Sequence, residues 1–253
     1  MGYIEFKPHP LLRCYVDAYW VVTAEDDTAT THRVFPDGCI DLIVNLGDDF
    51  LTDSGEYTMK NDAVFMVGTM TRYKDTVRRP GSCLVGIRFK PLGFSAFFKF
   101  GSLHEITEKT VEFDKKLLPE LHDYKNETFR RLDKFLYDRL SVRTQKLQAA
   151  LSDIQNVRGV GSIDTIAKQN CFTSRQLERD FKQHLGISPK EYANFIRYQN
   201  AFRLITHQKD RANLLDIALE AGYYDHAHLA NEIKKFSGLS PSQLKNVGFF
   251  QTS

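Results

Sequence analysis

Between residues 162 and 245 the apolar positions form one pattern that occurs twice. The first copy contains Ile166, Ala167, Phe172, Leu177 and Phe181, and the second contains Ile217, Ala218, Tyr223, Leu229 and Ile233. The offset between the two copies grows by one residue after Tyr223, which places a single insertion in a turn. Internal repetition of this kind indicates a duplicated supersecondary unit.

Each copy predicts a short helix, a tight turn and a second helix. Leu177, Phe181 and Leu185 recur at i, i+4 and i+8, which is one stripe along a helix. Leu229 and Ile233 begin the equivalent stripe in the second copy. A small residue in the first helix, a turn and an amphipathic second helix are the parts of a helix-turn-helix. Its second helix enters the DNA major groove.

Both copies also contain sequence motifs that are typical of one known family. They are Leu177-Glu178-Arg179, Phe181-Lys182 and Gly186-Ile187-Ser188-Pro189, then Ala221-Gly222-Tyr223, Asp225, Lys234, Phe236, Gly238 and Leu239-Ser240-Pro241-Ser242-Gln243. With these phrases, residues 162–245 resemble the paired helix-turn-helix domain of the AraC/XylS transcription regulators. The resemblance implies an all-α domain that binds double-stranded DNA and regulates transcription. It leaves room for contact with RNA polymerase and for a homodimer.

The amino-terminal part of the chain predicts short strands. Residues 15–22, 31–35, 39–46, 63–69 and 83–90 are rich in aromatic and β-branched side chains. Pro36-Asp37-Gly38 is turn chemistry between two of these strands, whereas the polar segment 47–55 predicts a loop. Short strands separated by turns favour a small antiparallel barrel or sandwich.

From Pro91 onward the period changes to that of helices. Short helices are predicted around residues 94–98 and 103–106, longer ones over 117–140 and 141–156, and a hinge at 158–161. The sequence therefore predicts an α+β chain. We expect a sensor domain over 1–115, a helical connector with a role in coupling or dimerisation over 116–156, and a DNA-binding domain over 157–253.

Several phrases of the first half are similar to a sensor type that is attached to AraC-like DNA readers. They are Tyr19-Trp20, Arg33 with Pro36-Asp37-Gly38, Asp41-Leu42-Ile43, and Gly86-Ile87-Arg88-Phe89 with Pro91. This second resemblance implies a cupin-like domain that binds a small-molecule effector.

Composition narrows the class of protein without identifying it. No run of about 18 apolar residues predicts a membrane span, and no secretory signal is visible, so we expect a cytoplasmic protein. Four separate cysteines form no CxxC pair, which argues against a structural zinc site. The net charge of +2 is too small to indicate nucleic-acid binding by itself.

Candidate chemistry in the first half is weak. The histidines of the strand region are scattered, and His226 and His228 would point about 200° apart on a helix, so we expect no metal and no cofactor. Asp37 and Asp41 could be paired carboxylates, but a turn role for Asp37 and an ion pair of Asp41 with Arg33 or Arg88 explain them better. We therefore predict no catalytic site. Two alternatives stay open: an enzyme in the strand half, and an interaction module whose helix-turn-helix units have lost DNA binding.

In the first copy, the face opposite the apolar stripe carries Ser174, Arg175, Glu178, Arg179 and Lys182. Arg175 and Arg179 lie at i and i+4, and an arginine can donate two hydrogen bonds to guanine O6 and N7. Glu178 can accept from a cytosine amine, and Lys182 is placed to contact phosphate. The competing interpretation is a solvated face with Arg/Glu pairing.

In the second copy, the corresponding face carries His226, Asn231, Lys234 and Lys235. Asn231 can read adenine through N6 and N7, and the two lysines are expected on phosphates. An apolar-rich helix over 189–207 should join the two units across roughly 28 Å, which is close to the roughly 34 Å between successive major-groove windows.

Overall fold

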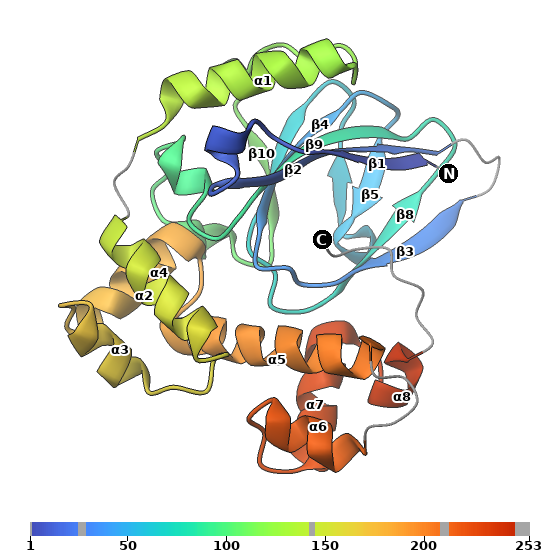
Figure 1. The fold of residues 1–253 in the computed structure, drawn as a ribbon. Helices are drawn as coiled ribbons and strands as arrows, with labels where there is room; N and C mark the ends of the chain where they lie inside the picture. Colours follow the sequence, from blue (N-terminus) through green and yellow to red (C-terminus); the bar gives the residue numbers. More distant parts are fainter. Residues whose placement is uncertain (1, 25–28, 142–144, 208–212, 246–253) are drawn as a thin grey trace.

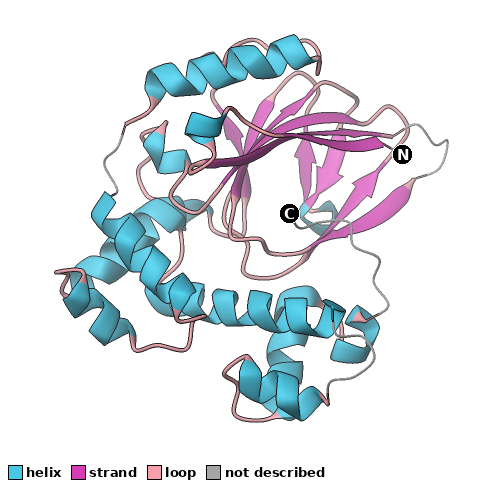
Figure 2. Cartoon of the chain, viewed as in Figure 1, coloured by secondary structure: helices cyan, strands magenta, loops and turns pink. Residues whose placement is uncertain are grey.

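The computed structural model describes residues 2–24, 29–141, 145–207 and 213–245. Two β-sheets form the amino-terminal half, and helices form the carboxyl-terminal half (Figures 1 and 2). The strands are β1 Gly2–Phe6, β2 Val16–Thr23, β3 Thr30–Val34, β4 Ile40–Asn45, β5 Phe50–Thr52, β6 Tyr57–Met59, β7 Val64–Val67, β8 Lys74–Arg78, β9 Cys83–Phe89 and β10 Thr110–Phe113. The α-helices are α1 Asn126–Arg139, α2 Gln145–Asn156, α3 Ile163–Gln169, α4 Ser174–Leu185, α5 Pro189–His207, α6 Leu214–Glu220, α7 His226–Ser237 and α8 Pro241–Leu244.

The larger sheet has the order β1-β2-β9-β4-β7-β10 and the smaller one β3-β8-β5-β6, and every pairing is antiparallel. The two sheets face each other without closing into a barrel. The sandwich alternative of the sequence prediction therefore describes the fold.

Side chains of the larger sheet alternate between two cores, as the period of a strand requires. Tyr19 and Ile87 belong to the core under α1 and the short 3₁₀ helices, whereas Trp20 and Leu84 belong to the core between the sheets. The indole of Trp20 lies directly over β9. A Cβ on Gly86 would lie 2.0 Å from Trp20 Cε2, so only glycine fits at that position.

Two local predictions were wrong. The segment 47–55 contains β5, with Phe50 and Thr52 buried between the sheets, rather than being only a loop. The helices expected over 117–140 reduce to α1, and its buried face rests on the larger sheet. The helix expected over 141–156 is confirmed as α2, which is described from Gln145 to Asn156; residues 142–144 lie outside the described residues. The 94–98 and 103–106 segments do form short helices, of the 3₁₀ type, at Phe94–Ala96 and Leu103–Ile106.

The carboxyl-terminal helices share one apolar core. It includes the predicted stripe residues of both copies, together with side chains from α2 and α5. Tyr198 of α5 stacks on Phe236 of α7 at a centroid distance of 4.5 Å, and Tyr192 of α5 meets Phe181 of α4 at 6.0 Å. The 19-residue α5, about 28 Å long, therefore joins the two helix-turn-helix units as predicted.

Candidate nucleic-acid interface and sensor pocket

The first helix-turn-helix unit consists of α3 and α4. Thr173 caps α4: its hydroxyl accepts from Gln176 N, and the Gln176 side chain accepts from Thr173 N, which makes a full capping box. Leu177 and Phe181 have no exposed surface. With its apolar stripe in the core and its first turn capped, α4 presents the opposite face to solvent.

That exposed face carries the predicted reading residues. Ser174, Arg175, Glu178 and Arg179 are exposed and Lys182 is half-buried. Among the described residues Arg175 makes no hydrogen bond or ion pair, and Arg179 pairs only with its neighbour Asp180, at 3.0 Å. Both guanidinium groups lie outside the protein core and are accessible to a partner.

Part of the competing interpretation also holds. Glu178 pairs with Lys182 at 2.9 Å, so the Arg/Glu pairing considered from the sequence is instead a Lys/Glu pair. Ser174 donates to Asp164 of α3 at 2.6 Å, which ties the start of α4 to the preceding helix.

The second unit consists of α6 and α7. Asp225 caps α7 by accepting from His228 N at 2.7 Å, and Leu229 and Ile233 are fully buried. The predicted residues His226, Asn231, Lys234 and Lys235 are all exposed; Lys235 pairs with Glu232 at 3.5 Å.

The sequence prediction did not single out Tyr224, which lies in the turn before α7 and is 87% exposed. Two consecutive tyrosines occupy this turn, and only Tyr223 fits the buried position of the repeat. The second tyrosine, next to the start of a predicted reading helix, was the sequence signal that could have identified this residue. Arg197 of α5 holds the same turn, with its guanidinium 5.5 Å from the Tyr223 ring centroid.

Each reading helix ends against the amino-terminal half. The carbonyl of Gly186, which caps α4, accepts from Thr107 Oγ1 at 2.7 Å and from His104 Nδ1 at 2.8 Å. The preceding carbonyl, Leu185 O, accepts from Thr69 Oγ1 at 2.6 Å. Carbonyls at a helix end lack partners within the helix, so the sheet domain supplies them here.

The end of α7 has an equivalent contact. A Cβ on Gly238, which caps this helix, would lie 2.4 Å from Tyr73 Cε1. Arg33 lies over the Tyr73 ring at 4.1 Å and forms a two-hydrogen-bond pair with Asp75. Of the two partners predicted for Asp41, Arg33 is therefore not the one found, because Asp75 on the neighbouring strand binds its guanidinium.

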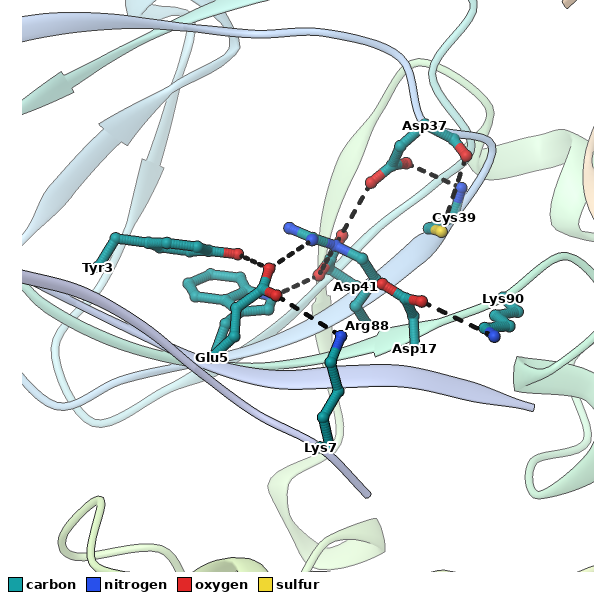
Figure 3. Close-up of polar contacts among 10 residues, drawn as sticks. Tyr3, Glu5, Lys7, Asp17, Asp37, Cys39, Asp41, Arg88 and Lys90 are labelled. Atoms are coloured by element: carbon teal, nitrogen blue, oxygen red, sulfur yellow. Dashed lines mark hydrogen bonds and ion pairs between the residues drawn. The ribbon is translucent and has the colours of Figure 1, made fainter. Parts of the chain in front are cut away.

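The alternative partner, Arg88, is the one that Asp41 has. Its guanidinium lies 3.6 Å from Asp41, 3.3 Å from Asp37 and 3.3 Å from Glu5 (Figure 3). Trp20 Nε1 also donates to Asp41, at 2.6 Å. Burial raises the pKa of Asp41 to about 6, although Arg88 opposes this shift.

Trp20, Asp37, Asp41 and Arg88 of this polar cluster line a pocket between the two sheets. The pocket has a volume of about 750 Å³ with its open mouth included. A second pocket, of about 930 Å³, lies where the sheet domain meets Tyr192 and Phe195 of α5. Asp37 and Arg88 line both pockets.

The described residues contain no group of three His, Cys, Asp or Glu side chains that could hold a metal ion. In the same part of the chain, no helix is long and apolar enough to cross a membrane.

The chain was compared with known proteins. Residues 166–246 match a family described as a helix-turn-helix domain, and residues 4–112 match a domain of unknown function (DUF6597). The first match agrees with the two exposed helices, α4 and α7, that α5 joins. The helical half is a helix-turn-helix domain.

Its curated relatives are transcriptional regulators. The chain is 31% identical over 106 residues to an uncharacterized HTH-type transcriptional regulator of Haemophilus influenzae, covering 42% of this chain and 35% of that protein. It is 30% identical over 112 residues to the HTH-type transcriptional regulator ArgR of Pseudomonas aeruginosa (44% and 33%). It is 31% identical over 90 residues to the transcriptional activator RhaS of Escherichia coli (35% and 32%). The chain thus spans about a third of the length of these relatives.

Solved structures of the same kind are also similar. ToxT of Vibrio cholerae aligns over 85% of this chain and 96% of its own, with a TM-score of 0.49 and 9% identity. An AraC-type regulator of Chromobacterium violaceum aligns over 40% of this chain and 88% of its own, with a TM-score of 0.37 and 27% identity.

Proposed function

We propose that this protein is a sequence-specific DNA-binding regulator of transcription, which acts in the cytoplasm and responds to a small molecule bound by its sheet domain. The observation that carries the proposal is the pair of capped helices, α4 and α7, whose polar faces are exposed while one rod, α5, fixes their separation. A rod of about 28 Å suits two windows of the major groove that lie roughly 34 Å apart.

Within this proposal, Arg175 and Arg179 read guanine, Glu178 selects against phosphate and for cytosine, and Lys182 contacts the backbone. In α7, Asn231 and His226 read bases, and Lys234 and Lys235 bind phosphate. The free guanidinium of Arg175 and the purely local pair of Arg179 support this assignment, because little has to be broken before either side chain meets DNA.

The test begins by selecting sites from random duplex DNA with the full-length protein. On the selected site, Arg175→Ala and Arg179→Ala should each weaken binding by about 1–3 kcal/mol and relax the choice at one base pair. Lys235→Ala should weaken all sequences equally and lower the salt slope by about one unit. Arg130→Ala is the matched control, because Arg130 is equally exposed but lies on α1, far along the chain from either reader.

Failure has a clear form. If no sequence is enriched, or if both arginine variants bind the site as the unchanged protein does, the helical half is an interaction module and not a DNA reader. The symmetry of an enriched site also tests whether the protein binds DNA as a homodimer. One chain is proposed to read two major-groove windows, so a palindromic site would require two chains.

The sensing role is supported by the contacts between the halves. The sheet domain holds the carboxyl-terminal cap of both reading helices, and Asp37 and Arg88 line both the inner pocket and the pocket at α5. A ligand that moves either side chain would therefore act on the surface against which α5 is packed. We assign coupling to these contacts as well as to the 116–156 segment, and contact with RNA polymerase to the exposed surface of the helical half.

A further inference from the structure

The inner pocket has one charged group without a counter-ion. Side chains of β8 alternate, so Lys74, Thr76 and Arg78 all face the pocket between the sheets. Lys74 is already paired with Asp53 at 2.7 Å and donates to Glu108 O at 2.9 Å. Arg78 has no ion pair among the described residues, and its Nη1 is buried without a hydrogen-bond acceptor.

A buried guanidinium nitrogen without an acceptor is costly, and native proteins seldom leave one. Burial lowers the pKa of Arg78, as expected for a cation that has lost water and gained no anion. Burial, together with Arg78, also lowers the pKa of His32 on the paired strand β3. Arg78 therefore places a positive charge on the pocket lining, and no carboxylate of the described residues is paired with it.

The other charged lining groups already have ion-pair partners, although Arg88 Nε also lacks a hydrogen-bond acceptor. Asp37 and Asp41 are paired with Arg88, and Asp41 also accepts from the Trp20 indole. A cationic ligand would compete with Arg88 for these carboxylates, whereas an anionic ligand finds Arg78 free. Most of the remaining lining is apolar, and it includes Trp20, Val22, Ile43, Phe50, Met59 and Leu84.

We propose that this pocket binds a small organic anion with an apolar body, its charged group on Arg78 and its body along Trp20, Phe50 and Met59. A guanidinium holds a carboxylate or phosphate oxygen through short charge-assisted hydrogen bonds, and an apolar wall removes the rest of the ligand from water. The inference rests on the sensing role proposed above and gives it a ligand class.

The single tryptophan of the chain makes the experiment specific, because Trp20 lines this pocket. Full-length protein is titrated with octanoate, 1-naphthoate and 1-naphthyl phosphate while the fluorescence of Trp20 is followed. Octylamine and octanamide, which have the same apolar chain but a positive or no charge, are the comparison ligands. We expect saturable binding of at least one anion and at least tenfold weaker binding of the amine and the amide.

Substitutions then locate the anion. Arg78→Gln should weaken binding of the anion at least tenfold, and Arg78→Lys should retain part of the affinity because it keeps the charge. Arg79→Gln is the matched control: the neighbouring arginine is exposed and does not line the pocket, so its loss should leave the affinity unchanged. Which of the three anions binds best distinguishes a carboxylate ligand from a phosphate ligand.

Three results would overturn the inference: no saturable change in fluorescence with any of the anions, tighter binding of octylamine, or equal anion affinity of R78Q and the unchanged protein. Thermal unfolding of R78Q shows whether the variant is folded, and a folded R78Q with full affinity is the decisive negative. DNA-site selection is independent of this titration, so a protein that selects a DNA site but binds no anion refutes only the ligand class.

Discussion

Adding a single methyl group at Gly38 should reveal whether the sheet domain packs tightly against α5, the helix that joins α4 and α7. Gly38 ends the turn between β3 and β4, has φ +74°, and faces Phe195 of α5. A Cβ at this position would lie 2.6 Å from Phe195 Cε1 and 3.2 Å from Cζ, well inside ordinary contact. Phe195 is 3% exposed and belongs to the helical core, and it also lines the second pocket.

Two costs add in Gly38→Ala. An L-residue at positive φ costs about 1–2 kcal/mol, and forcing a methyl group into a packed contact costs about 1–3 kcal/mol. The free energy of unfolding should therefore fall by about 2–5 kcal/mol. Gly55→Ala separates the two costs, because Gly55 has φ +92° and nothing within 4 Å of the added Cβ. That variant should lose only the first part.

The assay is urea unfolding of full-length protein, followed by Trp20 fluorescence for the sheet domain and by circular dichroism for the helices. Phe195→Leu completes a double-mutant cycle, since leucine lacks the ring atoms that the new methyl group would meet. In the F195L background, Gly38→Ala should cost no more than Gly55→Ala does. If G38A and G55A lose equal unfolding free energy, or if the effects of G38A and F195L are strictly additive, the turn at Gly38 does not pack tightly against α5.

Two further outcomes follow from the contacts. Because the folded-state pKa of Asp41 is raised to about 6, its contribution to stability is present below about pH 4 and is lost as the pH rises through 6. The difference in unfolding free energy between Asp41→Asn and the unchanged protein should therefore vary over this range, and parallel pH curves would contradict the assignment. Thr107→Val should lower the free energy of unfolding by about 0.5–1.5 kcal/mol, because Gly186 O loses one of its hydrogen-bond donors. Amide exchange at the end of α4 should become faster for the same reason. Unchanged exchange there would mean that the end of α4 does not depend on its contact with the sheet domain.

The sequence was most informative where one local pattern decides the structure. Both reading helices contain the predicted apolar stripes, and in each an amino-terminal cap and a terminal glycine mark the ends of the same helix. The residues predicted to meet DNA are exposed for the same reason: once Leu177 and Leu229 are in the core, helix geometry fixes the opposite face. Whether they contact bases stays a prediction.

The pairing of strands and side chains that lie far apart in the chain could not be predicted from the sequence. β5 was missed because a three-residue strand in a polar segment has too few positions to show alternation, and it becomes a strand only through β6 and β8. The sequence left Arg33 and Arg88 open as partners of Asp41, because the choice depends on β3 lying beside β8, which places Asp75 opposite Arg33. The role proposed for Arg78 could not be predicted from the sequence for a related reason. Whether a side chain lacks an ion-pair partner depends on the residues around it in the folded pocket.

The contacts also limit how a sensor could act on these readers. Gly186 and Gly238 touch the sheet domain at the carboxyl-terminal ends of α4 and α7, whereas Arg175 and His226 lie at the opposite, free ends. Because each helix is packed along its length against the helical core, the sheet domain can affect it mainly as a rigid unit. A shift of that domain would therefore change the orientation of α4 relative to α7 and leave in place the exposed side chains that are predicted to contact DNA. Regulation of this kind predicts that an effector alters affinity for the complete two-window site far more than affinity for either half of it.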